Sequence, residues 1–491
     1  MHCDLSTIIE QAALNKIAIA TDSRNVTKGA LFLAIPGVVH DGAKFVPDAV
    51  QRGAKYLICR EDLAANISAK YPNLNVCGVA NVRLAQAKVA AAYYHTKEEK
   101  LKIIGVTGTN GKTTTTYLLE ALFTAKGSKV GVLGTINYRY PGHLEPAPLT
   151  TPDALTTHKM LAEMAKVGCS HCVMEVSSHA IDQSRIAEVP FTVCSFSNLT
   201  QDHLDFHQTM ANYFAVKKRL FTDFGREDKT SVLNLDDPYG RELAKELPKI
   251  CTYGLKPLQE LQDLGCKLEN HLQGELLSSN TQGIHLKLHY QGTSWELQTP
   301  LIGAFNASNL LATMAIGLSL GLEPKDFAPL SEFHGVPGRL ERIKVPHKHI
   351  FVDYAHTPDA LKNVLQALRQ AGFTKIITVF GCGGNRDRQK RPLMGEMVAK
   401  YADIAVLTSD NPRYEEPQAI LDDVMPGLKG AKEVQVEVDR KKATHLALNL
   451  LQDEHDCVLI AGKGHEDYQI IQGVRHHYSD QEVVREFYQC D

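Results

Sequence analysis

The sequence lacks a marked excess of either charge. Its 491 residues include 53 Lys and Arg against 56 Asp and Glu, which gives a formal net charge of −3 at pH 7. A protein dedicated to nucleic acid would carry a basic excess, because contacts with phosphate supply much of its affinity. The composition therefore predicts no nucleic-acid partner.

Long apolar runs are also lacking. No run approaches the roughly 20 residues that a membrane-spanning helix needs, and the most apolar stretch, 310–322, is interrupted by Thr, Ser and Gly. The first residues do not show the basic and then apolar pattern of a signal peptide. We therefore expect a cytoplasmic protein with no membrane span.

The eleven cysteines show neither the spacing of a disulfide framework nor that of a zinc site. Scattered cysteines of this kind fit reduced thiols in a cytosol. The hydrophobic fraction of 44% and the charged fraction of 22% are ordinary for a folded chain and exclude disordered, collagen-like and coiled-coil classes. At about 150 residues per domain, the length predicts about three domains.

Two changes of pattern divide the chain into three segments, 1–96, 97–332 and 333–491. A charged stretch at 97–100 precedes a sharply apolar run, and turn-forming residues gather from 321 to 338 after a helical stretch. We expect one domain in each segment.

Short apolar runs alternate with helical patterns in the second and third segments. Because strands separated by helices form parallel sheets, this alternation predicts an α/β fold with a mostly parallel sheet in each. The run 284–290 alternates between apolar and polar residues and predicts a small antiparallel addition. The expected parallel strands cover residues 102–106, 129–133, 172–174, 191–194, 231–235, 351–352, 376–380, 404–407 and 458–460.

The strongest motif, at 105–114, directly follows the strand at 102–106 and precedes a helical stretch. Its glycines allow backbone N–H groups and a helix N-terminus to face phosphate oxygens. Lys112 is placed to neutralise phosphate charge, and the Thr113 hydroxyl to bind Mg²⁺. Val106 stands where the usual spaced pattern has its first glycine, so the loop is of the Gly-Thr-Asn-Gly-Lys-Thr type. The motif predicts nucleotide binding.

Polar clusters follow other expected strands, at 174–179 and 198–207 in the second segment. In a parallel sheet these loops meet beside the phosphate loop, which makes Glu175 and His203 candidates for work at a metal ion. Four further strand ends in the third segment are rich in Asp, Arg, His and Glu, which predicts a second polar edge facing the first across a cleft. They lie at 353–358, 381–387, 409–413 and 462–466.

Together these motifs resemble those of the Mur ligases, ATP-dependent amide-forming enzymes of peptidoglycan assembly. The resemblance covers essentially the whole chain, and the joint occurrence of its motifs in this order is far more specific than any one of them. The motifs are Gly-Thr-Asn-Gly-Lys-Thr at 108–113, Met-Glu-Val-Ser-Ser-His at 174–179, Asp202-His203 with Lys217, 301–309, Val-Pro-Gly-Arg-Leu-Glu at 336–341 and Asp-Asn-Pro-Arg-Tyr-Glu-Glu-Pro at 410–417.

The resemblance implies three domains: an N-terminal UDP-binding domain over 1–96, a central P-loop ATPase-type domain over 97–332, and a C-terminal amino-acid-binding domain over 333–491. The last would have a dinucleotide-fold-like parallel sheet. The ATP contacts that it implies are Gly108, Thr109, Asn110, Gly111, Lys112, Thr113, Thr114, Asn306, Asn309 and Arg339.

The same resemblance implies two further small-molecule substrates. UDP-N-acetylmuramoyl-L-alanyl-D-glutamate would be held by Ser23, Val38, Val39, His40, Thr150, Thr151, Ser177, Gln183 and Arg185. Leu149 departs from the family pattern, because relatives can have Asn there. The amino acid meso-2,6-diaminopimelate would be held by Arg386, Asp410, Asn411, Pro412, Arg413, Gly462 and Glu466.

Lys217 matches the lysine that this family carboxylates with CO₂. A free lysine, with a pKa of roughly 10.4, would be a cation and would repel a metal ion. A carbamate instead offers anionic oxygens to Mg²⁺. From the residues alone, the preferred interpretation of Lys217 is a solvated lysine of a helix that begins near Thr209. The resemblance implies the catalytic set Lys112, Glu175, His203 and Lys217, and the Mg²⁺ ligands Thr113, Glu175, His203 and carboxylated Lys217.

The implied reaction joins meso-diaminopimelate to the D-glutamate γ-carboxyl of the nucleotide-sugar dipeptide through an acyl phosphate, in peptidoglycan precursor synthesis. We expect a monomer with small-molecule partners only. Alternatives are a sister ligase that adds lysine, a folylpolyglutamate synthase on the same scaffold, a P-loop mechanical or signalling NTPase, and a non-catalytic nucleotide-sugar-binding protein. The folate alternative explains neither the uridine-type segment near Ser23 nor the Asp-Asn-Pro-Arg motif at 410–413.

Overall fold

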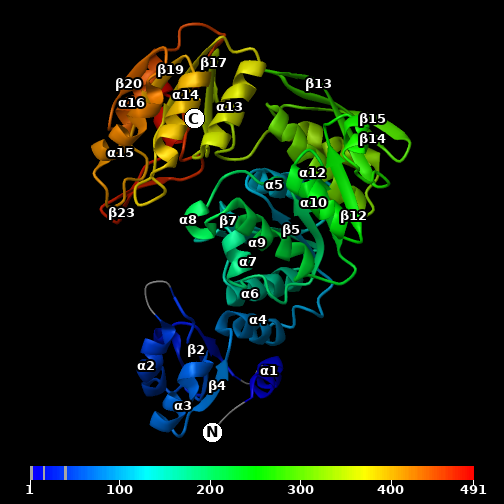
Figure 1. Ribbon diagram of the computed structural model, residues 1–491, viewed down its shortest axis with the longest axis vertical. Coiled ribbons are helices and arrows are strands. Elements are labelled where there is room, and N and C mark those ends of the chain that lie inside the picture. Colours follow the sequence, from blue (N-terminus) through cyan, green and yellow to red (C-terminus); the bar gives the residue numbers. More distant parts are fainter. Residues whose placement is uncertain (1–3, 15–16, 38–40, 491) are drawn as a thin grey trace.

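The structure is a computed structural model that describes residues 4–14, 17–37 and 41–490. Three sheets follow one another along the chain, each with helices packed against it, and they form three successive bodies in space (Figure 1). The predicted α/β class is confirmed. Within the described residues, no helix is both long and apolar enough to cross a bilayer.

The first sheet is parallel, with strands in the order β1-β2-β3-β4. Its strands are β1 (Ile19–Ala20), β2 (Leu31–Leu33), β3 (Tyr56–Arg60) and β4 (Asn75–Val79). The helical elements around it are α1 (Leu5–Ala13), η1 (Ser23–Asn25), η2 (Gly42–Phe45), α2 (Val46–Gln51), α3 (Glu61–Lys70) and α4 (Val82–Tyr93).

The second sheet has eleven strands in the order β15-β14-β13-β12-β11-β10-β5-β9-β6-β7-β8. The neighbouring strands from β13 to β6 in this spatial order pair in parallel, and the hairpins at both edges of the sheet are antiparallel. The antiparallel addition predicted around 284–290 is therefore confirmed, whereas the β7–β8 hairpin at the other edge was not predicted. The strands are β5 (Lys102–Thr107), β6 (Val130–Leu133), β7 (Asn137–Tyr140), β8 (His143–Pro146), β9 (His171–Glu175), β10 (Phe191–Phe196), β11 (Thr230–Asn234), β12 (Ile250–Gly254), β13 (His271–Asn280), β14 (Gly283–Tyr290) and β15 (Thr293–Thr299).

Strand β5 lies between β9 and β10, so the loop that follows it lies at the middle of the sheet. These strands are apolar almost throughout because helices cover both faces of the sheet. The helical elements are α5 (Lys112–Ala125), α6 (Ala154–Lys166), α7 (Ser178–Asp182), α8 (Leu204–His207), α9 (Met210–Thr222), α10 (Pro238–Glu246), α11 (Leu258–Asp263), α12 (Ala304–Ser319) and η3 (Pro324–Glu332).

The third sheet has six strands in the order β16-β17-β21-β18-β19-β20, all parallel except the edge strand β16. Strands β22 and β23 form a separate hairpin. The strands are β16 (Glu341–Val345), β17 (Lys348–Asp353), β18 (Lys375–Phe380), β19 (Ile404–Leu407), β20 (Val434–Val436), β21 (Asp456–Ala461), β22 (Tyr468–Ile471) and β23 (Val474–His477). The helical elements are α13 (Pro358–Gln370), α14 (Lys390–Tyr401), α15 (Pro417–Val424), η4 (Met425–Leu428), α16 (Arg440–Asn449) and α17 (Asp480–Tyr488).

Side chains join the three bodies at their boundaries. Helix α4 packs on α6, where the Gln86 amide donates a 3.2 Å hydrogen bond to Asp153, the N-cap of α6. The Asn110 amide donates to Asp359 at 3.1 Å, which links the second body to the third. Each sheet lies inside one of the segments 1–96, 97–332 and 333–491, and the exact ends of those segments stay predictions.

Candidate active site

The loop after β5 has the conformation that phosphate binding requires. Gly108 and Gly111 both have positive φ, at +148° and +89°. A Cβ on Gly108 would lie 2.0 Å from Ser197 Oγ, and one on Gly111 would lie 2.4 Å from Asn309 Oδ1, so neither position has space for a side chain. Lys112 curls back over the loop and donates to the carbonyls of Gly108 and Thr109 at 2.9 Å each. Burial lowers the pKa of Lys112, because the charged ammonium is poorly solvated there. A phosphate anion beside it would stabilise the charged form.

Glu175 ends β9 and is almost fully buried beside this loop. It accepts hydrogen bonds from the Thr113 hydroxyl at 3.1 Å and from the backbone N–H and hydroxyl of Thr135 at 2.8 and 2.9 Å. Arg339 reaches across from the third body and donates to Thr113 Oγ1 at 3.0 Å. The structure therefore brings the predicted residues Thr113, Glu175 and Arg339 together.

Lys217 lies on α9, which begins after the N-cap residue Thr209 as predicted. Its side chain is only 1% exposed, unlike the helix neighbours Lys218 and Arg219, which form ion pairs near the surface. Lys217 Nζ donates to the Gly108 carbonyl at 2.9 Å and to Thr107 Oγ1 at 3.4 Å, and it lies over the Tyr213 ring. Among the described residues, no carboxylate forms an ion pair with it.

This environment disfavours the charged amine. Burial lowers the pKa of Lys217 well below its ordinary value of 10.5, and the charge of Lys112 lowers it further. A neutral amine is a nucleophile. Lys217 is therefore a buried lysine rather than a solvated lysine of a helix surface.

His203 lies at the N-cap of α8 with a left-handed backbone, φ +54°. Its ring stacks edge-on against His179, with centroids 4.9 Å apart, and faces the Tyr213 ring at 6.3 Å. Since Tyr213 also lies under Lys217, His203 and Lys217 flank the same aromatic ring. In the described chain, no hydrogen bond joins His203 to Thr113 or Glu175, and no group of three or more His, Cys, Asp and Glu residues could hold a metal ion by itself.

Asn306 and Asn309 begin α12, behind the phosphate loop, and both are buried. The Asn306 amide donates to the Ile302 carbonyl at 2.9 Å, and the Asn309 amide donates to Asn306 Oδ1 at 3.1 Å. This arrangement leaves Asn309 Oδ1 against Gly111. Asn309 thus lies against the loop, and Asn306 accepts from its amide.

The residues predicted for the nucleotide-sugar dipeptide form two groups. Ser23 lies in η1 of the first body, whereas Val38, Val39 and His40 lie outside the described residues. In the second body, Thr151 donates to the Glu175 carbonyl at 2.8 Å and accepts from the Ser177 N–H at 3.1 Å. The remaining residues join this group, because Arg185 donates to the Thr151 carbonyl at 3.1 Å and to Gln183 Oε1 at 2.7 Å, and Thr135 donates to Thr150 Oγ1 at 3.2 Å.

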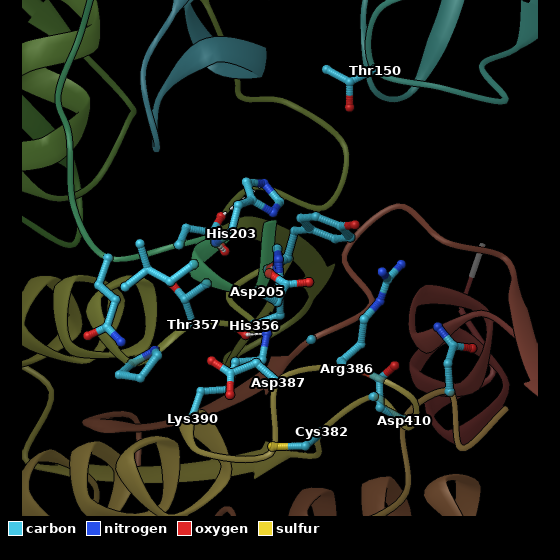
Figure 2. A pocket seen from close by; sticks show the side chains of 18 of the residues that line it. Thr150, His203, Asp205, His356, Thr357, Cys382, Arg386, Asp387, Lys390 and Asp410 are labelled. Atoms are coloured by element: carbon cyan, nitrogen blue, oxygen red, sulfur yellow. Dashed lines mark hydrogen bonds and ion pairs between the residues drawn. The ribbon is translucent and has the colours of Figure 1, made fainter. Parts of the chain in front are cut away.

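A cavity of about 450 Å³ lies between the second and third bodies (Figure 2). One wall includes Thr150, Ser177 and Arg185, and the other includes Arg386, Asp410, Asn411, Arg413, Gly462 and Glu466. Figure 2 shows Arg386 pointing from its own wall toward the side where Thr150 lies. The loops after β18, β19 and β21 thus meet at one edge of the third sheet, as the sequence predicts.

Arg413 has a left-handed backbone, φ +55°, which the β22–β23 hairpin holds in place. Its N–H donates to the Ile470 carbonyl at 3.0 Å, and its carbonyl accepts from the Gln472 N–H at 2.6 Å. The guanidinium donates to the Gly384 carbonyl at 2.9 Å. Burial lowers the pKa of Arg413 and the charge of Arg386 lowers it further, whereas the charges of Asp410 and Glu466 raise it. This wall therefore presents two guanidinium groups beside two carboxylates.

The Glu466 carboxylate already has two partners within the protein. Its Oε2 accepts from the Asn411 amide at 2.9 Å and lies 3.4 Å from the ammonium of the fully buried Lys463. Lys463 also lies over the Tyr468 ring. Glu466 therefore faces the cavity in a fixed orientation, and only part of its charge is available to a ligand.

Several contacts at the site could not be inferred from motifs. Asn198, at the start of a polar cluster noted in the sequence, accepts from the Asn110 N–H at 2.9 Å and holds the phosphate loop. Lys463 falls in the cluster noted at 462–466. Thr135 and Asp359 carried no comparable signal. Their partners come from strands and helices far away in the sequence, and only the fold brings them together.

Three family models match successive parts of the chain. The Mur ligase family catalytic domain model matches residues 18–94, and the Mur ligase middle domain model matches residues 106–317. The model described as Mur ligase, glutamate ligase domain, matches residues 338–464. Together they cover most of the chain.

Individual relatives are similar over nearly the full length. A protein of Lawsonia intracellularis (strain PHE/MN1-00) named UDP-N-acetylmuramoyl-L-alanyl-D-glutamate–2,6-diaminopimelate ligase is 51% identical over 474 residues, which are 96% of each chain. One of the same name from Aquifex aeolicus (strain VF5) is 42% identical over 99% of this chain and 95% of its own. A solved structure of a protein of that name has a TM-score of 0.67 and 33% identity, covering 96% of this chain and 94% of its own.

Proposed function

The chain belongs to the Mur ligase family, and on that basis we propose that it is an ATP-dependent ligase for UDP-N-acetylmuramoyl-L-alanyl-D-glutamate and 2,6-diaminopimelate. It adds meso-diaminopimelate to the D-glutamate γ-carboxyl in peptidoglycan precursor synthesis. We further propose that the enzyme acts in the cytoplasm as a monomer with small-molecule partners only.

The observation that carries this proposal is the cavity with two different walls. Thr150, Ser177 and Arg185 stand on the wall proposed for the dipeptide, and Arg386 and Arg413 on the wall proposed for the amino acid. An amide bond can form only where a carboxyl carbon and an amine come into contact. A cavity between the two walls is the place where the two substrates would meet.

The chemistry has two steps. The γ-carboxylate attacks the γ-phosphorus of ATP in line, which forms an acyl phosphate and ADP. The amine of the amino acid then attacks the acyl carbon, and phosphate leaves from the tetrahedral intermediate. Lys112, now bonded to its own loop, would turn to the phosphate oxygens and offset the charge that they gain in the transition state.

The oxygen donors beside the loop suit a hard cation such as Mg²⁺. Thr113 and Glu175 lie 3.1 Å apart there, and His203 with carboxylated Lys217 would complete the set that we propose. When bound, the ion would offset negative charge on the phosphates. Because Lys217 is buried with a depressed pKa, its neutral amine can add to CO₂ and lose one proton, which gives a carbamate.

Lys217→Ala tests this role. We expect turnover to fall by roughly 100-fold, because loss of a group that orients a metal ion commonly costs 10- to 100-fold. Added short-chain carboxylic acids are expected to restore part of the activity by supplying the missing anionic oxygens. The measurement is phosphate release with and without such acids.

Lys218→Ala is the matched control, since Lys218 is the adjacent lysine and pairs with Glu246 near the surface. It should retain nearly full activity. Near-normal turnover of Lys217→Ala, or an unmodified Lys217 in the mass spectrum of the active enzyme, would show that no carbamate is needed.

The proposed function is tested by phosphate release with every combination of ATP, nucleotide-sugar dipeptide and amino acid. A ligase should require all three, and it should prefer meso-diaminopimelate to lysine. Release with ATP alone would indicate an NTPase, whereas binding of the nucleotide sugar with no turnover would indicate a binding protein. Turnover with a folate and glutamate in place of these substrates would identify a folylpolyglutamate synthase.

A further inference from the structure

Arg440 begins α16 and is fully buried behind the amino-acid wall of the cavity. Its Nε and Nη2 donate to the two carboxylate oxygens of Asp480 at 2.9 and 2.8 Å, and Nη2 also donates to the Ala461 carbonyl at 2.9 Å. The third nitrogen, Nη1, has no hydrogen-bond acceptor among the described residues. It lies 4.0 Å from Asp410 Oδ2.

Asp410 stands between Arg440 and the cavity. It is buried apart from its cavity side, and the Gln469 amide holds its backbone carbonyl at 2.6 Å. Gly462 fills the remaining gap, because a Cβ there would lie 2.6 Å from Asp410 Oδ2 and 4.0 Å from Arg440 Nη1. The Asp410 carboxylate is therefore enclosed by Arg440 and Gly462 on one side and open to the cavity on the other.

The charges of this group do not balance. Burial alone would lower the pKa of Arg440, but the charges of Asp480 and Asp410 outweigh it and raise the pKa, so the guanidinium stays a cation. Within this trio one cation faces two carboxylates, and beyond it Asp410 interacts with Arg413, whose pKa the Asp410 charge raises. A buried charge is costly unless it is paired. The open side of Asp410 is where a second cation can reach it.

We propose that Arg440 is a positioning residue of the amino-acid site, which holds the Asp410 carboxylate turned toward the cavity to receive an ammonium group of the incoming amino acid. This inference rests on the proposed function. The Nη1 donor has no acceptor in the described part of the chain, so a small shift of Asp410 Oδ2 toward Nη1 would complete a hydrogen bond. The other oxygen, Oδ1, would then be left to accept from the ammonium. The planar fork suits this task, since it binds Asp480 with one edge and still presents Nη1 to Asp410.

The test is the kinetics of Arg440→Gln with each substrate varied in turn. The KM for meso-diaminopimelate is expected to rise about tenfold, the loss that follows when a charged hydrogen-bonding partner is removed. The KM values for ATP and for the nucleotide-sugar dipeptide should stay within about twofold, because the contacts proposed for these substrates do not include Asp410. A purely structural role would lower the amount of active enzyme and would not single out one KM.

A double-mutant cycle with Asp410→Asn further separates an action of Arg440 through Asp410 from a purely structural role. If Arg440 acts through Asp410, adding Arg440→Gln to Asp410→Asn should raise the KM for the amino acid little beyond the single change. If the two effects multiply, or if Arg440→Gln alters all three KM values alike, the proposal is wrong. Arg440→Lys carries the same test if the Gln variant does not fold, because it keeps the charge and loses the fork.

Arg391→Gln is the matched control. Arg391 is also fully buried in the third body and pairs with Glu415 and Asp423, and among the described residues no ion pair joins it to Asp410. It should lower the melting temperature as Arg440→Gln does, while the KM for the amino acid changes much less. If the unaltered protein proved to use a different amino acid, the cycle would be run with that amino acid, so failure of the proposed function and failure of this inference remain distinguishable.

Discussion

Arg413→Ala is expected to use meso-diaminopimelate and lysine with similar efficiency, whereas the unaltered enzyme should prefer meso-diaminopimelate by about 10⁴-fold. The two amino acids share a carbon chain and differ by one distal carboxylate. A guanidinium grips such a carboxylate with two parallel charge-assisted hydrogen bonds. With lysine bound, Arg413 would stay unpaired beside Arg386, whose charge already lowers its pKa.

Competition between the two amino acids measures this preference, as the ratio of kcat/KM values for each enzyme. Arg388→Ala is the control, because Arg388 lies in the same loop as Arg386 but is exposed and pairs with Asp423. It should keep the full preference. Equal use of lysine by the unaltered enzyme would remove diaminopimelate from the proposed function, and an unchanged preference in Arg413→Ala would assign the selectivity to another residue.

Lys112→Ala is expected to lower phosphate release by a factor on the order of 10³ or more, because it removes the cation that offsets charge on the transferred phosphoryl group. The loop itself should persist, since Ser197 and Asn198 hold it independently of Lys112. ATP affinity should fall, while the nucleotide sugar, whose uridine part is proposed to bind in the first body, should bind as before. Calorimetry with each ligand separates the two effects.

Lys126→Ala serves as the control for Lys112→Ala. Lys126 follows the other end of the same helix and pairs with Asp326 near the surface, so its loss should leave both ligands and turnover unchanged. Loss of both ligands from Lys112→Ala would mean that the variant is unfolded or that the two sites are not separate.

The positions of the strand ends could be predicted, because the hydrophobic period and the turn-forming residues that follow each apolar run determine them. Each expected parallel strand is present, and the phosphate loop follows β5, an interior strand of its sheet. The role of Lys217 was open, since nothing in the spacing of α9 distinguishes it from Lys218. Burial distinguishes the two, and burial depends on which elements pack over the helix.

The supporting contacts of the site were not predictable for the same reason. Arg339 and Thr113 are 226 residues apart, and Asn110 and Asp359 are 249 apart. A pattern of apolar and polar residues gives the register of one element, but it does not say which two elements meet. The strands of the β7–β8 and β22–β23 hairpins have four residues each, too few to show a period, so they gave no signal either.

The hydrogen bonds between the β22–β23 hairpin and residues 410–413 have a consequence for the origin of selectivity. Ile470, Gln472 and Gln469 fix the backbone on which Asp410 and Arg413 stand, although they come from a distant part of the chain. Transplanting only the four-residue motif into a lysine-adding relative would therefore move the guanidinium without the support that aims it. The loop and the hairpin therefore determine selectivity together. A working chimera has to exchange both, and natural substitutions in one are expected to be accompanied by substitutions in the other.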